Sequence, residues 1–329
     1  MRMKIVIAVV AVIALIVVTY AVRAYYGTVD LGKRRVTVVI EQGDSFGGVA
    51  DTLVRERVVK SRIMLKLAAR LMNIDRKLAP GRYDFTGENS CRTVLDRFAR
   101  VDFLKIKVTV PEGSPIWKTA SILAAAMEFD SAAVRALERD SAFVAGLGVP
   151  GLEGYLYPET YYFPWGWTPE AVVAEMVELY HLQTAGIWPE AAPLGLSRRE
   201  VIILASIIEA ETKVDSERTV IASVYLNRLK QRMKLDADPT VIYGLGGLER
   251  PLYRKDLKKE TPYNTYVLPG LPPTPINSPG LASIKAALNP DETDFLFFVA
   301  DNNGGHYFSR TNAEHNRAKE RIRSGSKGS

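Results

Sequence analysis

The chain has 329 residues, of which 47% are hydrophobic and 24% charged, and its formal net charge is +6. Length and composition indicate a globular protein of about two domains, and the modest charge, without a basic patch interleaved with aromatic residues, argues against a nucleic-acid-binding protein. The single cysteine, Cys91, excludes a disulfide within the chain and a cysteine-based metal site.

The first feature along the chain is an almost unbroken apolar run from Ile5 to Ala21, which follows Arg2 and Lys4. A run of this length can cross a lipid bilayer, and tyrosines follow it where an interfacial aromatic belt would lie. We therefore predict that residues 1–26 form a short cytoplasmic tip and a transmembrane anchor, with the rest of the chain outside the cytoplasm. A cleaved signal peptide is the alternative, although the sequence offers a poor cleavage site.

Residues 27–103 are predicted to form a linker and a small module. β-branched residues favour a strand at 36–41, and a second strand is predicted at 82–85. Between them, apolar spacing favours two helices, at 46–57 and 63–72. This order of strand, helix, helix and strand is similar to that of LysM-like modules, which bind cell walls, and only the order of the elements carries that resemblance.

Residues 104–323 are predicted to form a second domain of mixed helices and strands, so the expected fold class is α+β with an N-terminal transmembrane helix. The run 201–211 is apolar on nearly all sides and predicts a buried helix, behind a capping-box pattern at 197–200. The Pro-, Gly- and Asn-rich segment 261–280 cannot be a regular helix or an inner strand. An irregular segment of this length is usually functional. A disordered tail, 324–329, is expected at the end.

Glu209 is the residue whose position most needs a chemical explanation. It follows the apolar part of the predicted buried helix, where a carboxylate costs free energy unless it is paired, neutralised or placed at a cleft. A protonated Glu is also what cleavage of a glycosidic bond requires as general acid. The alternative is a helix-end Glu in a salt bridge with a Lys or Arg, since such networks also perturb pKa values.

Two other residues of this helix bear on the same question. Glu211 lies two positions further on, about 200° around the helix, so the two carboxylates face opposite ways and do not form the pair of an ordinary glycosidase. Ser206 lies one turn before Glu209 on the same face and is a candidate to orient it.

The three histidines lack a metal-ligand spacing, so neither a metal nor a cofactor is expected.

Several stretches, in order, resemble the catalytic core of the endolytic murein transglycosylases, the MltG or YceG-like family. The resemblance covers nearly the whole chain. It is carried by LASIIEAET at 204–212, SER at 216–218, VYLNRL at 224–229, LDADPTVIYG at 235–244 and PYNTY at 262–266, with LAPGRYDF at 78–85, VPEG at 110–113 and LEG at 152–154 upstream.

The resemblance implies a carbon–oxygen lyase that cuts the β-1,4 bond between N-acetylmuramic acid and N-acetylglucosamine within nascent peptidoglycan strands. It would leave 1,6-anhydro ends and terminate strand elongation, with Glu209 as the essential residue and a LysM-like domain before the catalytic domain. It also implies a single-pass protein of the bacterial cytoplasmic membrane with its catalytic domain on the periplasmic side, and partnership with peptidoglycan synthases. Where the family has an aspartate after its aromatic-Pro motif, this chain has Glu159.

Beside Glu209, a set of polar and aromatic residues is predicted to contact the glycan. For each of them the alternative is a capping or packing role, and for Glu217 it is a first-turn acid favoured by the helix dipole. The set comprises Ser206, Glu217, Asp238, Thr240, Tyr243, Tyr263, Asn264 and Tyr266.

A lytic transglycosylase needs only one carboxyl group, because the C6 hydroxyl of the sugar itself attacks the anomeric carbon and the same group can act first as acid and then as base. Two rival functions remain. One is a non-catalytic peptidoglycan-binding scaffold for wall synthesis. The other is a hydrolytic muramidase, which requires a second carboxylate near Glu209, with Glu217 and Asp238 as the candidates.

Overall fold

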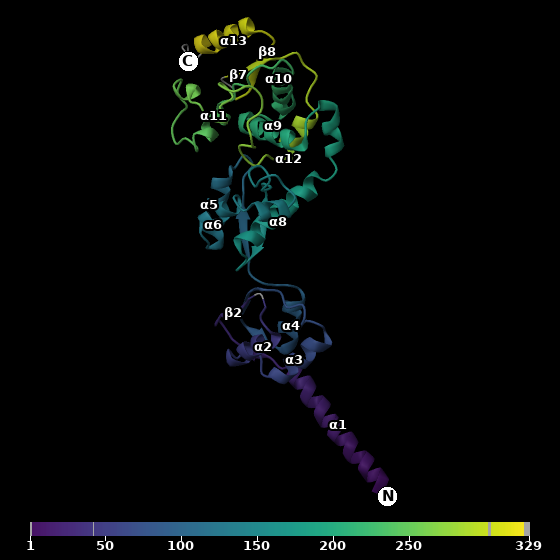
Figure 1. Cartoon of the computed structure of the whole chain (residues 1–329). Coiled ribbons are helices and arrows are strands. Elements are labelled where there is room, and N and C mark those ends of the chain that lie inside the picture. The colour runs from purple at the N-terminus through teal and green to yellow at the C-terminus, as the bar shows by residue number, and fades with distance from the viewer. Residues whose placement is uncertain (1, 42, 302–303, 326–329) are drawn as a thin grey trace. The chain divides into compact units, whose positions relative to one another are not determined.

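The computed structural model describes residues 2–41, 43–301 and 304–325. The chain forms two compact units, and each is described by itself. Unit 1 comprises Met1–Lys107 and Tyr162–Thr168, and unit 2 comprises Val108–Tyr161 and Pro169–Ser329. Both units combine helices with short two-stranded sheets (Figure 1), which confirms the predicted mixture of α and β structure.

Unit 1 begins with a long apolar helix, α1 (Arg2–Tyr26). Its stretch Met3–Tyr26 is long and apolar enough to cross a membrane, and its side chains are almost all exposed. Near its C-terminal end α1 contacts α3 (Arg62–Leu71) and α4 (Cys91–Ala99). The predicted N-terminal apolar helix is therefore confirmed.

The rest of unit 1 is built around β2 (Val36–Ile40) and β3 (Gly81–Phe85), which pair antiparallel with α2 (Phe46–Arg55) and α3 between them in sequence. The predicted order of strand, helix, helix and strand is confirmed, with limits shifted by one or two residues. A second strand pair, β1 (Val29–Asp30) with β4 (Glu88–Asn89), was not predicted, because two residues carry no periodicity.

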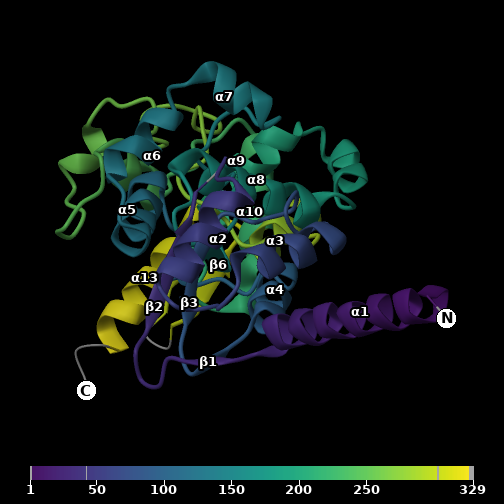
Figure 2. The same ribbon diagram turned by 90° about the horizontal axis from the view of Figure 1, so that it is seen from below.

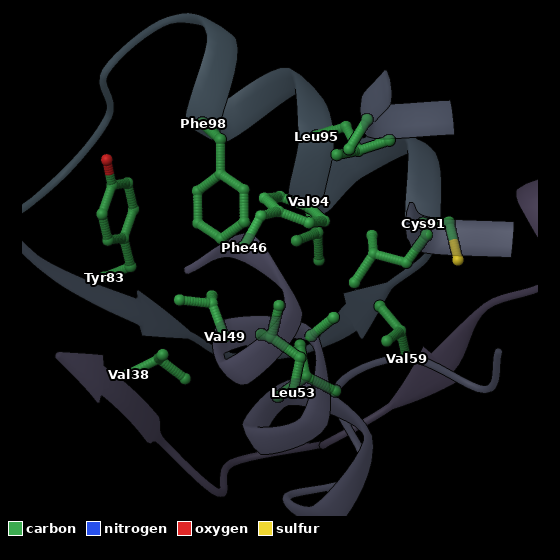
Figure 3. Packing of buried hydrophobic residues seen from close by; sticks show 14 of the residues in the cluster. Val38, Phe46, Val49, Leu53, Val59, Tyr83, Cys91, Val94, Leu95 and Phe98 are labelled. Atoms are coloured by element: carbon green, nitrogen blue, oxygen red, sulfur yellow. The ribbon is translucent and has the colours of Figure 1, made fainter. Parts of the chain in front are cut away.

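The core of unit 1 lies between these helices and the β2–β3 pair (Figure 3). Phe98 of α4 contacts Phe46 and Tyr83 edge-to-face, with ring centroids 6.2 and 4.9 Å away. Cys91 is also buried here, so its thiol fills space in the core.

β5 (Lys105–Thr109) and β6 (Thr160–Pro164) form one strand pair, and the division of the chain into two units falls within each of these strands. The helices of the first half of unit 2 follow in the order α5 (Ile116–Met127), α6 (Ser131–Leu137), α7 (Ser141–Gly146) and α8 (Pro169–Thr184), before the short 3-10 helix η1 (Trp188–Leu194).

The centre of unit 2 is α9 (Arg198–Glu211), which packs against α10 (Arg218–Lys230) and α12 (Leu281–Leu288). The predicted capping box is present: Ser197 accepts from the Glu200 backbone N–H and the Glu200 carboxylate accepts from the Ser197 N–H. Residues 201–208 are all buried, so α9 is the buried helix that its sequence predicts.

The remaining elements of unit 2 come after α9 in the chain. They are η2 (Asp215–Glu217), α11 (Asp238–Gly244), η3 (Asp256–Lys258), the hairpin β7 (Phe297–Ala300) with β8 (His306–Ser309), and α13 (Asn312–Gly325). Segment 261–280 has no regular helix or strand, as predicted, apart from one bridge between Ser278 and Ser114. Figure 2 gives a second view of these elements. Of the predicted tail, 324–325 belong to α13 and 326–329 lie outside the described residues.

Candidate active site

Glu209 lies in the last turn of α9, where the helix emerges from the core of unit 2. Its side chain is only 8% exposed and forms an ion pair of 3.2 Å with Arg218. The same carboxylate oxygen, Oε2, accepts a hydrogen bond of 3.0 Å from the backbone N–H of Gly280. Glu209 is therefore held by the start of α10, nine residues further along the chain, and by the end of the irregular segment, which is far from it in sequence.

Arg218 is the cation that balances this buried carboxylate. It is the first residue of α10, and its side chain is 11% exposed. Besides Glu209, its guanidinium donates to Ser283 Oγ on α12 and to Asp215 Oδ1, the latter at 3.0 Å. The ion pair proposed as the alternative role of Glu209 is thus present, and it fixes the carboxylate at one orientation.

A second carboxyl group, that of Glu112, lies beside Glu209. A Cβ atom added at Gly280 would collide with the Glu112 carboxylate, while Gly280 donates its N–H to Glu209. A Cβ added at Gly113 would lie 3.6 Å from Cγ of Glu209. Although Glu112 as a residue is exposed, partial burial of its carboxyl group, and then the negative charge of Glu209, raise its pKa. The two carboxyl groups therefore interact at one site.

The candidates predicted for this second carboxylate are engaged elsewhere. Glu217 accepts from the backbone N–H of His306 at 2.9 Å, and its other oxygen lies 2.7 Å from Nδ1 of the same residue, which ties η2 to β8. Asp238 accepts a hydrogen bond of 2.7 Å from the hydroxyl of Tyr266. Sequence reasoning missed Glu112, for which the VPEG match at 110–113 was the only signal.

Ser206 does not contact Glu209 by a hydrogen bond. Its hydroxyl is fully buried, donates to the Ile203 carbonyl at 2.7 Å and accepts from the Ile276 N–H at 3.1 Å. Its backbone carbonyl accepts from Nδ2 of Asn277 at 2.8 Å. Ser206 therefore fastens the irregular segment to α9, and the prediction that it orients Glu209 or touches substrate is not supported.

Thr240 and Asn264 are also fully buried, so their predicted place in a glycan groove is not supported. The Thr240 hydroxyl lies 2.9 Å from that of Thr265. The Asn264 amide donates to the carbonyls of Leu257 and Lys259 at 3.1 and 2.6 Å. These side chains satisfy backbone groups of irregular chain segments, which explains why polar residues occupy interior positions.

Tyr243, Tyr263 and Trp117 form an aromatic cluster that is partly exposed. The Tyr243 ring lies 4.9 Å from that of Trp117 and 4.7 Å from that of Tyr263, measured between centroids. The Tyr243 hydroxyl donates at 2.8 Å to Glu153, whose carboxylate also accepts from the Ile116 N–H. This buried glutamate fixes the orientation of Tyr243.

Glu153 predicts a pH dependence of stability. Burial raises its pKa from 4.5 to about 8, so between these values the folded chain binds a proton that the unfolded chain releases. The free energy of unfolding should therefore fall as pH rises from about 4.5 to about 8, by at most about 1.4 kcal/mol per pH unit for this one group. Urea unfolding at several pH values across this range should show that the free energy of unfolding changes less with pH for Glu153→Gln than for the unmodified chain. An equal pH dependence of the two proteins would contradict the raised pKa of Glu153.

A cavity of about 400 Å³ opens beside the other glutamate of α9, Glu211. The Tyr225 hydroxyl donates to Glu211 at 3.2 Å. Burial, and then the charge of Asp238, raise the pKa of Glu211 to about 7. Asp238 and Tyr266 line the same cavity. As predicted, the two glutamates of α9 have different surroundings.

Glu159 is exposed and accepts a hydrogen bond of 2.8 Å from the N–H of Thr160. Its charge is a minor contribution to the raised pKa of Glu112. Among the residues that the structure describes, no group of three or more His, Cys, Asp or Glu side chains is placed to hold a metal ion.

Residues 38–321 match the model of the YceG-like family. A Bacillus subtilis (strain 168) protein named endolytic murein transglycosylase is 31% identical over 308 residues, which cover 88% of this chain and 85% of that protein. A protein of the same name from Streptococcus pneumoniae serotype 2 is 25% identical, and the match covers 87% of this chain but 58% of that longer protein. A crystal structure described as a yceG-like protein from Listeria monocytogenes superposes with a TM-score of 0.61 at 31% identity, over 87% of this chain and 100% of that one.

Proposed function

Since the chain belongs to the YceG-like family, we propose that it is an endolytic peptidoglycan lytic transglycosylase with Glu209 as its acid/base. The observation that carries this proposal is the placement of Glu209. Its carboxylate lies at the end of a buried helix and is oriented by Arg218 and the Gly280 N–H. Glu112 lies beside it, so the site contains a second carboxyl group that can hold a proton.

The reaction needs a group that first donates a proton to the leaving oxygen and then accepts one from the attacking hydroxyl. A carboxyl group protonates O4 of N-acetylglucosamine as its bond to C1 of N-acetylmuramic acid breaks. The C6 hydroxyl of the muramic acid then attacks C1, and the carboxylate accepts the hydroxyl proton. One C–O bond breaks and one forms, so the products are a 1,6-anhydro end and a free 4-hydroxyl, and no water is consumed.

The second carboxyl group has a part in this scheme. The negative charge of Glu209 raises the pKa of the neighbouring Glu112 carboxyl group, so Glu112 retains its proton to a higher pH than an isolated glutamate would. Glu112 is thus proposed to keep the site protonated at the pH where cleavage occurs, without acting as a nucleophile.

Glu112→Gln is expected to lower kcat about tenfold, a loss of about 1.4 kcal/mol in transition-state stabilisation. The alkaline limb of the pH–rate profile should also move to lower pH, because the substitution removes the carboxyl group whose raised pKa keeps a proton in the site. Rates of cleavage measured from pH 4 to 9 would show both effects. The neighbouring Glu159→Gln is the matched control, and an unchanged profile for Glu112→Gln would assign Glu112 a structural role only.

The glycan groove is proposed to include the exposed parts of Tyr243 and Tyr263, with Trp117 as a further contact. Aromatic faces suit sugar rings, and Tyr243 is held in place by Glu153. Asp238 and Tyr266, which are bonded to each other beside Glu211, remain candidates for a more distant part of the groove. Glu217 remains a candidate for glycan binding only indirectly, because its carboxylate holds His306 in the β7–β8 hairpin.

We also propose that α1 is a single-pass anchor in the bacterial cytoplasmic membrane and that both units lie on its periplasmic side. The length and apolar surface of Met3–Tyr26 support the anchor. The strand, helix, helix, strand order of unit 1 supports a LysM-like module that binds peptidoglycan. Peptidoglycan synthases are the expected protein partners, since the substrate is the nascent strand.

Mass spectrometry of peptidoglycan strands digested by the full chain in detergent tests the proposed reaction. Internal cuts that bear 1,6-anhydro ends are the expected result. Reducing ends would instead indicate the hydrolytic muramidase, in which Glu112 would serve as the second carboxylate. Binding of strands without any cleavage would favour the non-catalytic scaffold.

A further inference from the structure

The outer face of α3 exposes three large apolar side chains in a row. Ile63, Leu67 and Leu71 are 79%, 51% and 78% exposed, and their spacing of four residues places them on one side of the helix. The opposite side is buried in the core of unit 1 through Leu65 and Ala69. Single exposed apolar residues are ordinary, but a continuous apolar stripe indicates a surface that something covers.

This stripe is continuous with the surface of α1. A groove of about 330 Å³ lies between the two helices, which contact each other within unit 1. Its walls are almost entirely apolar. They are formed by Ala21, Val22, Tyr25 and Tyr26 of α1 and by Met64, Leu67, Ala68, Leu71 and Met72 of α3 and its C-terminal end.

The position of the groove along α1 corresponds to the edge of a bilayer. At about 1.5 Å per residue the 24 residues of Met3–Tyr26 are about 36 Å long, while the hydrocarbon core of a bilayer is about 30 Å thick. The last turn of α1 therefore reaches the headgroups, and Ala21 and Val22 lie near the outer limit of the acyl chains. Leu67, which shares the groove with them, lies at the same depth.

Basic residues accompany the apolar stripe. Arg62, Lys66 and Arg70 are exposed and follow α3 at the same spacing of four residues, one position before each apolar residue. Arg62 is paired with Asp51, and Arg23 lies in the last turn of α1. An apolar face beside a row of cations is typical of a helix that lies in the interface of an anionic membrane.

We propose that α3 is a second membrane contact, which inserts Ile63, Leu67 and Leu71 among the outer-leaflet lipids while Lys66 and Arg70 contact their anionic headgroups. This proposal rests on the proposed role of α1 as an anchor. We expect lipid to occupy the groove, because one of its walls is α1, the proposed membrane anchor, which is itself surrounded by lipid. Two contacts fix the orientation of unit 1 relative to the membrane, which a single flexible anchor does not.

Nitroxide labels on the full chain test this arrangement in vesicles of phosphatidylglycerol and phosphatidylethanolamine. In a Cys91→Ser background, labels are attached separately at Leu67→Cys, Leu71→Cys, Val10→Cys in α1 and Val39→Cys in β2. Figures 1 and 2 both show β2 on a side of unit 1 away from α1. The collision rates of each label with oxygen and with a water-soluble nickel complex then report its depth.

The ratio of oxygen to nickel collisions at Leu67 and Leu71 should exceed that at Val39 several-fold and approach that at Val10. A ratio at Leu67 equal to that at Val39, with Val10 in lipid, would overturn the proposal and leave the anchor intact. Aqueous values at Val10 would overturn both, and cleavage of strands would then show whether the proposed enzyme survives without an anchor. A label at Leu67 reached by neither reagent would indicate burial against a second copy of the chain and would also overturn it.

Discussion

Glu209→Gln is expected to reduce the rate of strand cleavage by about 100-fold to 10 000-fold, the usual contribution of a general acid or base. The amide keeps the size of the side chain and can still accept from Arg218 and the Gly280 N–H, so the fold should be retained. It cannot donate a proton to the leaving oxygen or accept one from the C6 hydroxyl. The loss should appear in kcat, measured from the release of 1,6-anhydro ends over time.

The control is Glu200→Gln, which makes the same chemical change at the other end of α9. A Gln at this position preserves the capping box with Ser197, so cleavage should remain close to that of the unmodified chain. Thermal unfolding of both variants distinguishes loss of chemistry from loss of fold. Substantial cleavage by folded Glu209→Gln would assign the acid role to Glu112, whose carboxyl group lies beside that of Glu209.

Local sequence patterns were sufficient to predict α9 and the position of Glu209 on it. The capping box marks the beginning of the helix, and the all-round apolar run requires burial, so a carboxyl group in the last turn had to be explained. The partners of that carboxyl group were not predictable in the same way. Arg218 is only nine residues away, and a salt bridge with a Lys or Arg was the alternative prediction, but Glu112 and Gly280 come from distant segments that only the tertiary fold brings to Glu209.

The glycan-binding set shows the limit of reasoning from residue type. Amides, hydroxyls and tyrosines suit a sugar groove, but Thr240 and Asn264 are buried because the irregular segment needs internal hydrogen bonds. Tyr243 and Tyr263 come from the same stretches and stay partly exposed. Sequence pattern does not separate the two groups. Tyr263 and Asn264 lie in segment 261–280, which has no periodicity that assigns a face to each residue. Thr240 and Tyr243 lie in α11, which has only seven residues and is too short to show one. In unit 1, where periodicity is regular, α2 and α3 were predicted to within two residues.

Arg218→Met is expected to lower the free energy of unfolding by about 3–5 kcal/mol, the usual effect of removing one partner of a buried ion pair. The methionine has a similar reach but leaves the Glu209 carboxylate without its counter-charge at a site that is only 8% exposed. It also removes the bond to Ser283, which joins α10 to α12, and the bond to Asp215 of η2. Urea unfolding at pH 7 measures the loss, and Arg228→Met, which also has a buried guanidinium, serves as comparison.

The double variant Arg218→Met with Glu209→Gln separates the charge from the packing. If the unpaired carboxylate causes most of the loss, neutralising it should restore part of the stability, so the two changes should not be additive. The stability lost by the single Arg218→Met variant, relative to the unmodified chain at the same pH, should also be smaller at pH 5 than at pH 8, because a lone buried carboxylate that binds a proton no longer needs a partner. If the double variant is as unstable as the sum of both single variants, Arg218 acts mainly as a link between helices. In that case the ion pair with Glu209 contributes little to the free energy of unfolding.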